Sequence, residues 1–198
     1  MTPALIALAL LAPAIARADA PAPGAGEPAR RAIELDAYGG AVRRGDLTVT
    51  DDASTRNGGA ALAFGAHYRS RYFLTPFVDA AYYSLAASDR VVDLGRGPGY
   101  VLNRSWIFGL TGGLAFDVWR VRLRAGLGAY DLYVRTVTPG ARSTVSEIDF
   151  GYVAGASVYP LVRGRFRVGI EARVGLVVEA QTGFLSLGAT IGGDAISF

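Results

Sequence analysis

Apolar and polar residues alternate one by one along much of this chain. From Ser105 to Phe116, every second residue is large and apolar except Gly112, and the residues between them are small or polar except Ile107. The segment from Trp119 to Tyr130 alternates in the same way. Because successive side chains of a β-strand point to opposite faces, the pattern predicts two antiparallel strands, joined by a tight turn at Asp117-Val118.

The polar face of the second segment carries three arginines, Arg120, Arg122 and Arg124. Unpaired charges of this kind are too costly to bury in the dry core of an ordinary soluble protein. In a barrel that spans lipid, apolar side chains point outward and polar side chains point into the lumen. We therefore expect the apolar face to contact lipid and the three arginines to face a lumen.

Six more segments alternate similarly, which brings the expected number of strands to eight. They are residues 31–43, 59–69, 72–84, 145–159, 165–179 and a last strand that ends at Phe198. Their lengths suit the roughly 9–11 residues that a tilted transmembrane strand needs. Polar stretches at 44–58, 85–104 and 135–144 indicate long loops, and short turns separate the remaining strands. The pattern predicts an all-β fold, an eight-stranded antiparallel up-and-down transmembrane β-barrel.

The N-terminal segment has the pattern of a secretory signal peptide. An apolar stretch from Leu5 to Ile15 precedes Ala18-Asp19-Ala20, a small-x-small cleavage motif. We expect residues 1–20 to be a signal peptide cleaved near Ala20, residues 21–30 a flexible lead-in, and residues 31–198 the barrel. The alternative is an uncleaved membrane anchor, for which the apolar stretch is short.

The composition argues against several kinds of site and partner. The 198 residues include 26 glycines and no cysteine. Without cysteine the chain can form neither disulfides nor a cysteine-ligated metal site. The net charge is only +3, and no basic run is interleaved with aromatic residues, so we expect no nucleic-acid partner.

In its alternation, its aromatic positions and its terminal Phe198, the segment 31–198 resembles the small eight-stranded bacterial outer-membrane barrels, such as the OmpA barrel domain and OmpX. The resemblance implies the outer membrane of a Gram-negative bacterium, contact with outer-membrane lipids, and recognition of the C-terminal aromatic residue by the barrel-assembly machinery. The last strand departs from the family pattern, because Leu187 and Ile191 are out of phase with Ile196. Either a bulge at Gly192-Gly193 or an early end of the strand would explain this.

Aromatic residues are expected to form two girdles at the membrane boundaries. Those beside the short turns are Tyr68, Tyr72, Trp119 and Phe166. Those toward the long loops are Tyr82, Trp106, Phe150 and Phe184.

Charges on the inner faces nearly balance in sign, which predicts a network of ion pairs that plugs the lumen. An eight-stranded barrel is just wide enough for side chains to fill it, and guanidinium groups pair well with carboxylates. We expect the central Arg122 to pair with an acid from across the barrel, which could be Asp36, Asp79 or Glu171. The expected lumen network consists of Arg120, Arg122, Arg124, Glu147, Asp149, Glu171, Arg173, Asp36 and Asp79.

The sequence offers little that would support catalysis. His67, the only histidine, falls on an inner face and is interpreted as a lumen hydrogen-bonding residue. Ser70 is close in sequence, but serine and histidine alone do not define a nucleophile. No His/Asp/Glu cluster has metal-ligand spacing, and the glycines do not form a phosphate-binding loop. We expect no catalytic residues, no cofactor and no metal.

The sequence therefore favours a non-catalytic outer-membrane barrel, with a structural role or a loop-mediated surface partner at 44–58 and 85–104. Three alternatives remain: a narrow ion channel or porin, a lipid-A-modifying barrel enzyme, and a soluble lipocalin-like carrier. A channel would be lined by Arg120, Arg122 and Arg124. The carrier would need apolar inner faces and polar outer faces, the reverse of the pattern observed.

Overall fold

The computed structural model describes residues 31–46, 55–56, 58–69, 74–93, 98–138 and 140–197. The expected signal peptide and lead-in at residues 1–30 lie outside the described residues, as do Ser70, Tyr72 and Phe198. Among the residues that are described, no helix is long and apolar enough to cross a membrane.

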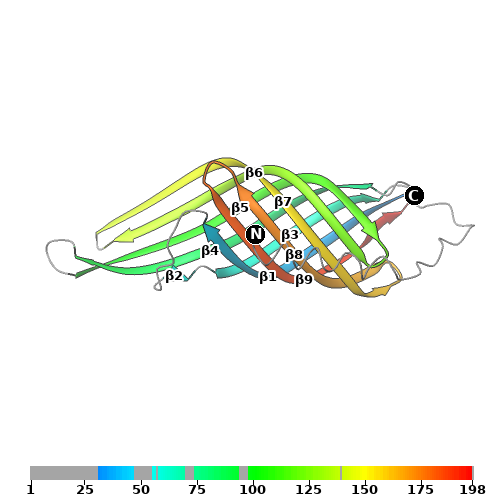
Figure 1. The fold of residues 1–198 in the computed structure, drawn as a ribbon, viewed down its shortest axis with the longest axis horizontal. Helices are drawn as coiled ribbons and strands as arrows, with labels where there is room; N and C mark the ends of the chain where they lie inside the picture. The colour runs from blue at the N-terminus through cyan, green and yellow to red at the C-terminus, as the bar shows by residue number, and fades with distance from the viewer. Residues whose placement is uncertain are drawn as a thin grey trace, which may run out of the picture.

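Eight long strands close into a single antiparallel sheet (Figure 1), as the alternation predicted. They are β1 (Ala32–Asp46), β3 (Gly58–Arg69), β4 (Leu74–Asp93), β5 (Pro98–Val118), β6 (Val121–Thr138), β7 (Ala141–Arg163), β8 (Phe166–Val177) and β9 (Thr182–Ser197). Each strand pairs with its neighbours in the chain, and the pairing of β1 with β9 closes the ring. A further strand of two residues, β2 (Thr55–Arg56), pairs with Ser88 and Ala87 of β4 and is not one of the eight strands of the ring. The described chain is therefore an up-and-down barrel.

The two faces of the barrel wall have the polarity expected for contact with lipid. Large apolar side chains point outward, for example Phe64, which is 68% exposed, and Ile148, which is 74% exposed. Charged side chains point inward instead, and Glu34, Arg122 and Glu171 are almost completely buried. A soluble carrier would have polar side chains outside and apolar side chains inside, so this distribution disfavours a soluble carrier.

The two ends of the barrel differ in the length of their hairpins. At one end, called here the short-turn end, β5 turns directly into β6, β7 turns into β8, and the described chain begins and ends. At the other, called here the hairpin end, the β4–β5 and β6–β7 hairpins project furthest (Figure 1).

The prediction of long loops at 85–104 and 135–144 is wrong, because both stretches are mostly strand. The β4–β5 ladder runs from Leu74 opposite Phe116 to Asp93 opposite Pro98. The β6–β7 ladder continues to Thr138 opposite Ala141. Strands that project beyond the lipid zone need no apolar outer face, so polar composition alone does not separate them from loops. The third expected loop, at 44–58, lies mostly outside the described residues.

The β5–β6 turn is formed by Trp119 and Arg120, not by Asp117 and Val118 as expected, and Val118 pairs with Val121. Trp119 has a positive φ of 53°, a conformation that usually calls for glycine or asparagine. The sequence therefore carried no turn signal at this position. The displacement brings each arginine of β6 two residues closer to the short-turn end, and Arg122 stands opposite Asp117.

A bulge in β9 explains the change of phase near the C-terminus. Ile33 pairs with Ile196 and Glu34 pairs with Asp194, so Ala195 is the extra residue. Both Ile191 and Ile196 consequently point outward. The bulge lies just past the expected Gly192-Gly193, and the strand continues to Ser197.

Candidate functional site

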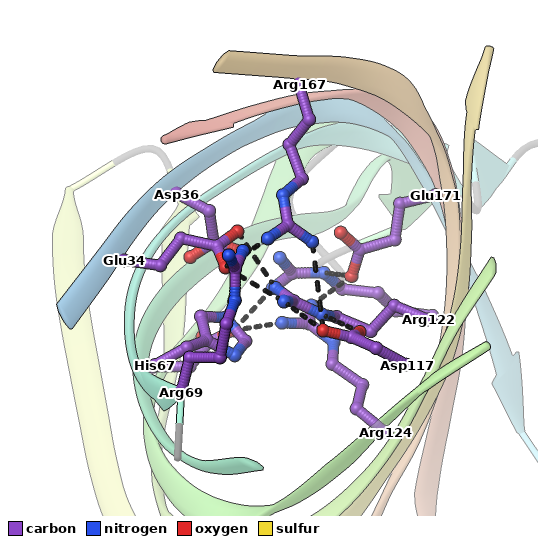
Figure 2. Close-up of polar contacts among 11 residues, drawn as sticks. Glu34, Asp36, His67, Arg69, Asp117, Arg122, Arg124, Arg167 and Glu171 are labelled. Atoms are coloured by element: carbon purple, nitrogen blue, oxygen red, sulfur yellow. Dashed lines mark hydrogen bonds and ion pairs between the residues drawn. The ribbon is translucent and has the colours of Figure 1, made fainter. Parts of the chain in front are cut away.

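The most distinctive chemistry of the barrel is an ion-pair network inside it, in which side chains from several strands converge (Figure 2). Near the short-turn end, the Glu34 carboxylate of β1 is the centre of one cluster. Arg122 donates from Nη1 to Glu34 Oε1 at 3.1 Å and from Nη2 to Oε2 at 2.9 Å. Arg167 of β8 donates to Oε2 at 2.6 Å, and Arg69 of β3 donates to it at 3.2 Å. One carboxylate thus ties four strands together.

Arg122 also contacts the acid directly opposite it on β5. Its Nε lies 2.6 Å from Asp117 Oδ1, and its Nη2 lies 2.8 Å from Asp117 Oδ2. The guanidinium therefore makes two bidentate contacts, the geometry that suits arginine best. The partners differ from the expected Asp36, Asp79 and Glu171, because the displaced turn brings Arg122 closer to the short-turn end.

A second cluster lies deeper in the barrel and joins two arginines to two acids. Arg124 and Arg173 each donate from Nη1 to Asp79 Oδ2 at 3.0 Å. Arg173 Nε donates to Glu171 Oε1 at 2.7 Å, and Arg124 Nη2 is ion-paired with the same oxygen. All four side chains are almost fully buried, and their formal charges cancel. Such mutual pairing offsets the cost of removing the charges from water.

His67 lies beside this second cluster and faces Asp36. The distance from His67 Nε2 to Asp36 Oδ2 is 3.2 Å, and the imidazole stacks on Phe77 with ring centroids 5.6 Å apart. His67 is completely buried. An enclosed imidazole with a carboxylate neighbour suits a lumen residue, as the sequence interpretation had it, since a catalytic base must reach its substrate.

Three members of the expected network, Arg120, Glu147 and Asp149, lie outside the two clusters. Arg120 is exposed in the β5–β6 turn, where it donates to the carbonyl oxygen of Pro160 at 2.9 Å. Glu147 is exposed at the hairpin end. Asp149 is buried near Glu147, away from the arginine clusters. Conversely, Glu34 is the main acceptor although it was not among the expected network residues.

Toward the hairpin end, the interior is apolar and aromatic. Phe184 packs against Tyr83, with ring centroids 4.3 Å apart, and against Tyr130 at 6.3 Å. The expected place of Phe184 in an outer aromatic girdle is therefore wrong. Glycines make room for these rings: a Cβ at Gly109 would lie 2.7 Å from a ring carbon of Tyr130, and one at Gly151 would lie 2.8 Å from another. The described interior thus carries charged clusters at one level and aromatic rings at another.

A cavity of about 400 Å³ lies at the short-turn end, outside the Glu34 cluster. Its lining includes Arg69, Asp117, Arg167 and Asp194 together with Tyr159. Arg69 bridges Glu34 and Asp194, and Arg167 lies over the ring of Tyr159, 5.2 Å from its centroid. The cavity is therefore a polar mouth whose floor is the first ion-pair cluster.

No protein-family model matches the chain, and no curated protein matches its sequence. Solved structures match its fold. Ail, the attachment invasion locus protein of Yersinia pestis, solved in complex with the heparin analogue sucrose octasulfate, aligns with a TM-score of 0.58 and 12% identity over 85% of this chain and 99% of that chain. A second structure of Ail gives a TM-score of 0.55 and 14% identity, over 84% and 99% of the two chains. Neisserial surface protein A aligns with a TM-score of 0.51 and 15% identity, over 82% of this chain and 96% of that chain.

The chain therefore has the fold of the small eight-stranded transmembrane β-barrels of outer membranes. The resemblance to such barrels, which rested on the alternation, the aromatic positions and the terminal Phe198, is confirmed at the level of the fold.

Proposed function

We propose that this protein is a non-catalytic barrel of the bacterial outer membrane, exported with loss of residues 1–20 and active through its projecting hairpins. The observation that carries the proposal is the polarity of the wall, with large apolar side chains outside and paired charges inside. This arrangement suits a barrel surrounded by lipid. Outer-membrane lipids and the barrel-assembly machinery would then be its general partners.

Its orientation follows from the two ends. In outer-membrane barrels, short turns face the periplasm and longer connections face the outside. The short-turn end would be periplasmic, with Trp119 and Phe166, both exposed on the outer wall, at that boundary. Trp106 and Tyr133 stack with ring centroids 5.6 Å apart toward the hairpin end and would mark the outer boundary. Aromatic side chains of this kind favour the membrane–water interface.

The paired interior favours a closed lumen over a channel. Ions pass a charged constriction when binding is weak enough to allow release. Here Arg122, Arg124 and Arg173 are each held by two carboxylates, and the aromatic layer around Phe184 lies beyond them. We infer that the lumen is plugged.

The test of this proposal is fractionation of cells that express the full chain. We expect the mature protein in the outer membrane, resistant to salt and carbonate extraction, with faster gel migration before heating than after. Recovery in the soluble periplasmic fraction would reject the proposal.

A specific feature of the hairpin end favours a surface-binding role. Arg104 of β5 and Arg135 of β6 stand directly opposite each other, although like charges in that relation repel. Both line a cavity of about 430 Å³ together with Tyr82 and Trp106. An acidic ligand at this place would relieve the repulsion. The sulfated ligand of Ail makes sucrose octasulfate a suitable probe.

Binding of sucrose octasulfate should be saturable for the wild type and strongly reduced when Arg104→Ser and Arg135→Ser are combined. Arg163→Ser, which removes an exposed arginine near the short-turn end, is the matched control and should bind normally. Equal binding by all three proteins, or by none, would remove this surface role and leave the membrane location untouched.

A further inference from the structure

Three carboxylates meet at the hairpin end, away from both arginine clusters. Glu147 and Asp149 stand on the same face of β7, and Glu179 lies in the turn between β8 and β9. One carboxylate oxygen of each lies within 4.8 Å of the others. Spacing in the sequence did not indicate this group, because Glu179 reaches it only through the pairing of β7 with β8.

Asp149 is the buried member, with a side chain held in one orientation. It is 3% exposed, and its Oδ2 accepts a hydrogen bond of 3.0 Å from the backbone N–H of Ala180. Its Oδ1 is buried without a hydrogen-bond partner. A buried carboxylate oxygen without a donor is costly, and a bound cation would remove that cost.

The protein supplies no such partner within its described part. Three other buried carboxylates are each paired with at least two arginines. They are Glu34, Asp79 and Glu171. Asp36 faces His67. No described arginine forms an ion pair with Glu147, Asp149 or Glu179. Among the described residues, the group is thus a concentration of negative charge without an arginine partner, whereas the other buried acids are paired.

We propose that Glu147, Asp149 and Glu179 bind a calcium ion. The donors are all carboxylate oxygens, which Ca²⁺ prefers, and exposure of the two glutamates leaves space for the water ligands that complete six- to eightfold coordination. Mg²⁺ demands a stricter octahedron and releases water reluctantly, so it fits this open rim less well. The bound ion would fasten β7 to the β8–β9 turn. This inference does not rest on the membrane location.

Calcium binding is tested by calorimetric titration of CaCl₂ into the full-length barrel, folded in detergent and stripped with chelator. We expect one saturable site with a Kd on the order of 10⁻⁴–10⁻³ M, the range of extracellular calcium modules. Asp149→Asn keeps the shape of the side chain and should weaken binding by at least about tenfold, since affinity follows the charge of the ligands. Asp131→Asn is the control, because Asp131 lies close by on β6 but accepts a hydrogen bond from Ser146.

Unfolding temperatures of two further variants provide a second test, which remains valid if the Asp149→Asn variant misfolds. Glu147→Gln and Glu179→Gln change exposed residues, and each removes one repelling charge. In chelator their unfolding temperatures should equal or exceed that of the wild type, whereas in millimolar CaCl₂ they should fall below it. Absence of saturable Ca²⁺ binding, unchanged binding in Asp149→Asn, equally tight Mg²⁺ binding, or no reversal of order between the two conditions would each overturn the proposal.

Discussion

Arg122 on β6 reaches across the barrel interior to Glu34 on β1, with its two terminal nitrogens 3.1 Å and 2.9 Å from the two carboxylate oxygens. Both side chains are at most 1% exposed. The contact joins strands that are not neighbours in the ring, so it braces the wall against its opposite side. Its geometry gives the first prediction.

Glu34→Gln should destabilise the barrel strongly. The change removes the charge that faces Arg69, Arg122 and Arg167 while preserving the size of the side chain. Loss of one partner from a buried ion pair costs about 3–5 kcal/mol, because the remaining charge stays buried. Urea unfolding in lipid vesicles measures this, with Asp131→Asn as the partly exposed acid control. A loss no greater than that of the control would show that Glu34 does not hold the cluster together.

The second cluster should behave as one neutral unit. Asp79→Asn and Arg124→Met each leave a net charge behind, whereas the double variant restores neutrality. The double variant should therefore be more stable than the sum of the single losses predicts, by roughly 0.5–3 kcal/mol. A double-mutant cycle by urea unfolding gives this coupling energy, and additive losses would mean that the pairing contributes nothing.

Much of the fold could be predicted because side-chain alternation reports directly on which face of a strand a residue occupies. Inward Asp36, Asp79 and Glu171 were identified in this way, and all three are buried. The exact partners could not be predicted, because they depend on register. A two-residue displacement of the β5–β6 turn to Trp119-Arg120 was enough to exchange them.

The alternation of apolar and polar residues did not predict other features of the structure, for different physical reasons. Phe184 belongs to the inner face of β9, but an aromatic residue near a strand end suits either a membrane girdle or the interior. In the sequence, the stretches 85–104 and 135–144 are rich in charged residues, glycine and proline, a composition typical of loops. Their pairing is a property of the backbone, which composition does not report.

The aromatic layer makes its own prediction about stability. Phe184→Ala should cost about 3–5 kcal/mol, because it removes a buried ring that contacts Tyr83 and Tyr130. Leu185→Ala is a matched control, since the next residue points outward and is 55% exposed. Thermal unfolding in bilayers should separate the two variants clearly. Similar losses for both would place the Phe184 ring outside the packed interior.

The two tryptophans test the boundaries of the wall. Trp119 is 67% exposed at the short-turn end, and Trp106 lies toward the hairpin end. In single-tryptophan variants, Trp106→Phe and Trp119→Phe, quenchers placed in the lipid near the headgroups should reduce the fluorescence of the remaining indole. Quenching by a water-soluble agent alone, in both variants, would contradict the assigned outward faces.

The closed lumen is the central claim, and planar-bilayer recording of the wild-type protein tests it most directly. Two carboxylates hold Arg122, and the cluster of Arg124, Arg173, Asp79 and Glu171 lies deeper in the barrel. We therefore predict insertion with little steady conductance. Stable, ion-selective channels in the wild type, with selectivity lost in Arg122→Ala, would contradict the plugged interior and establish a pore lined by that arginine.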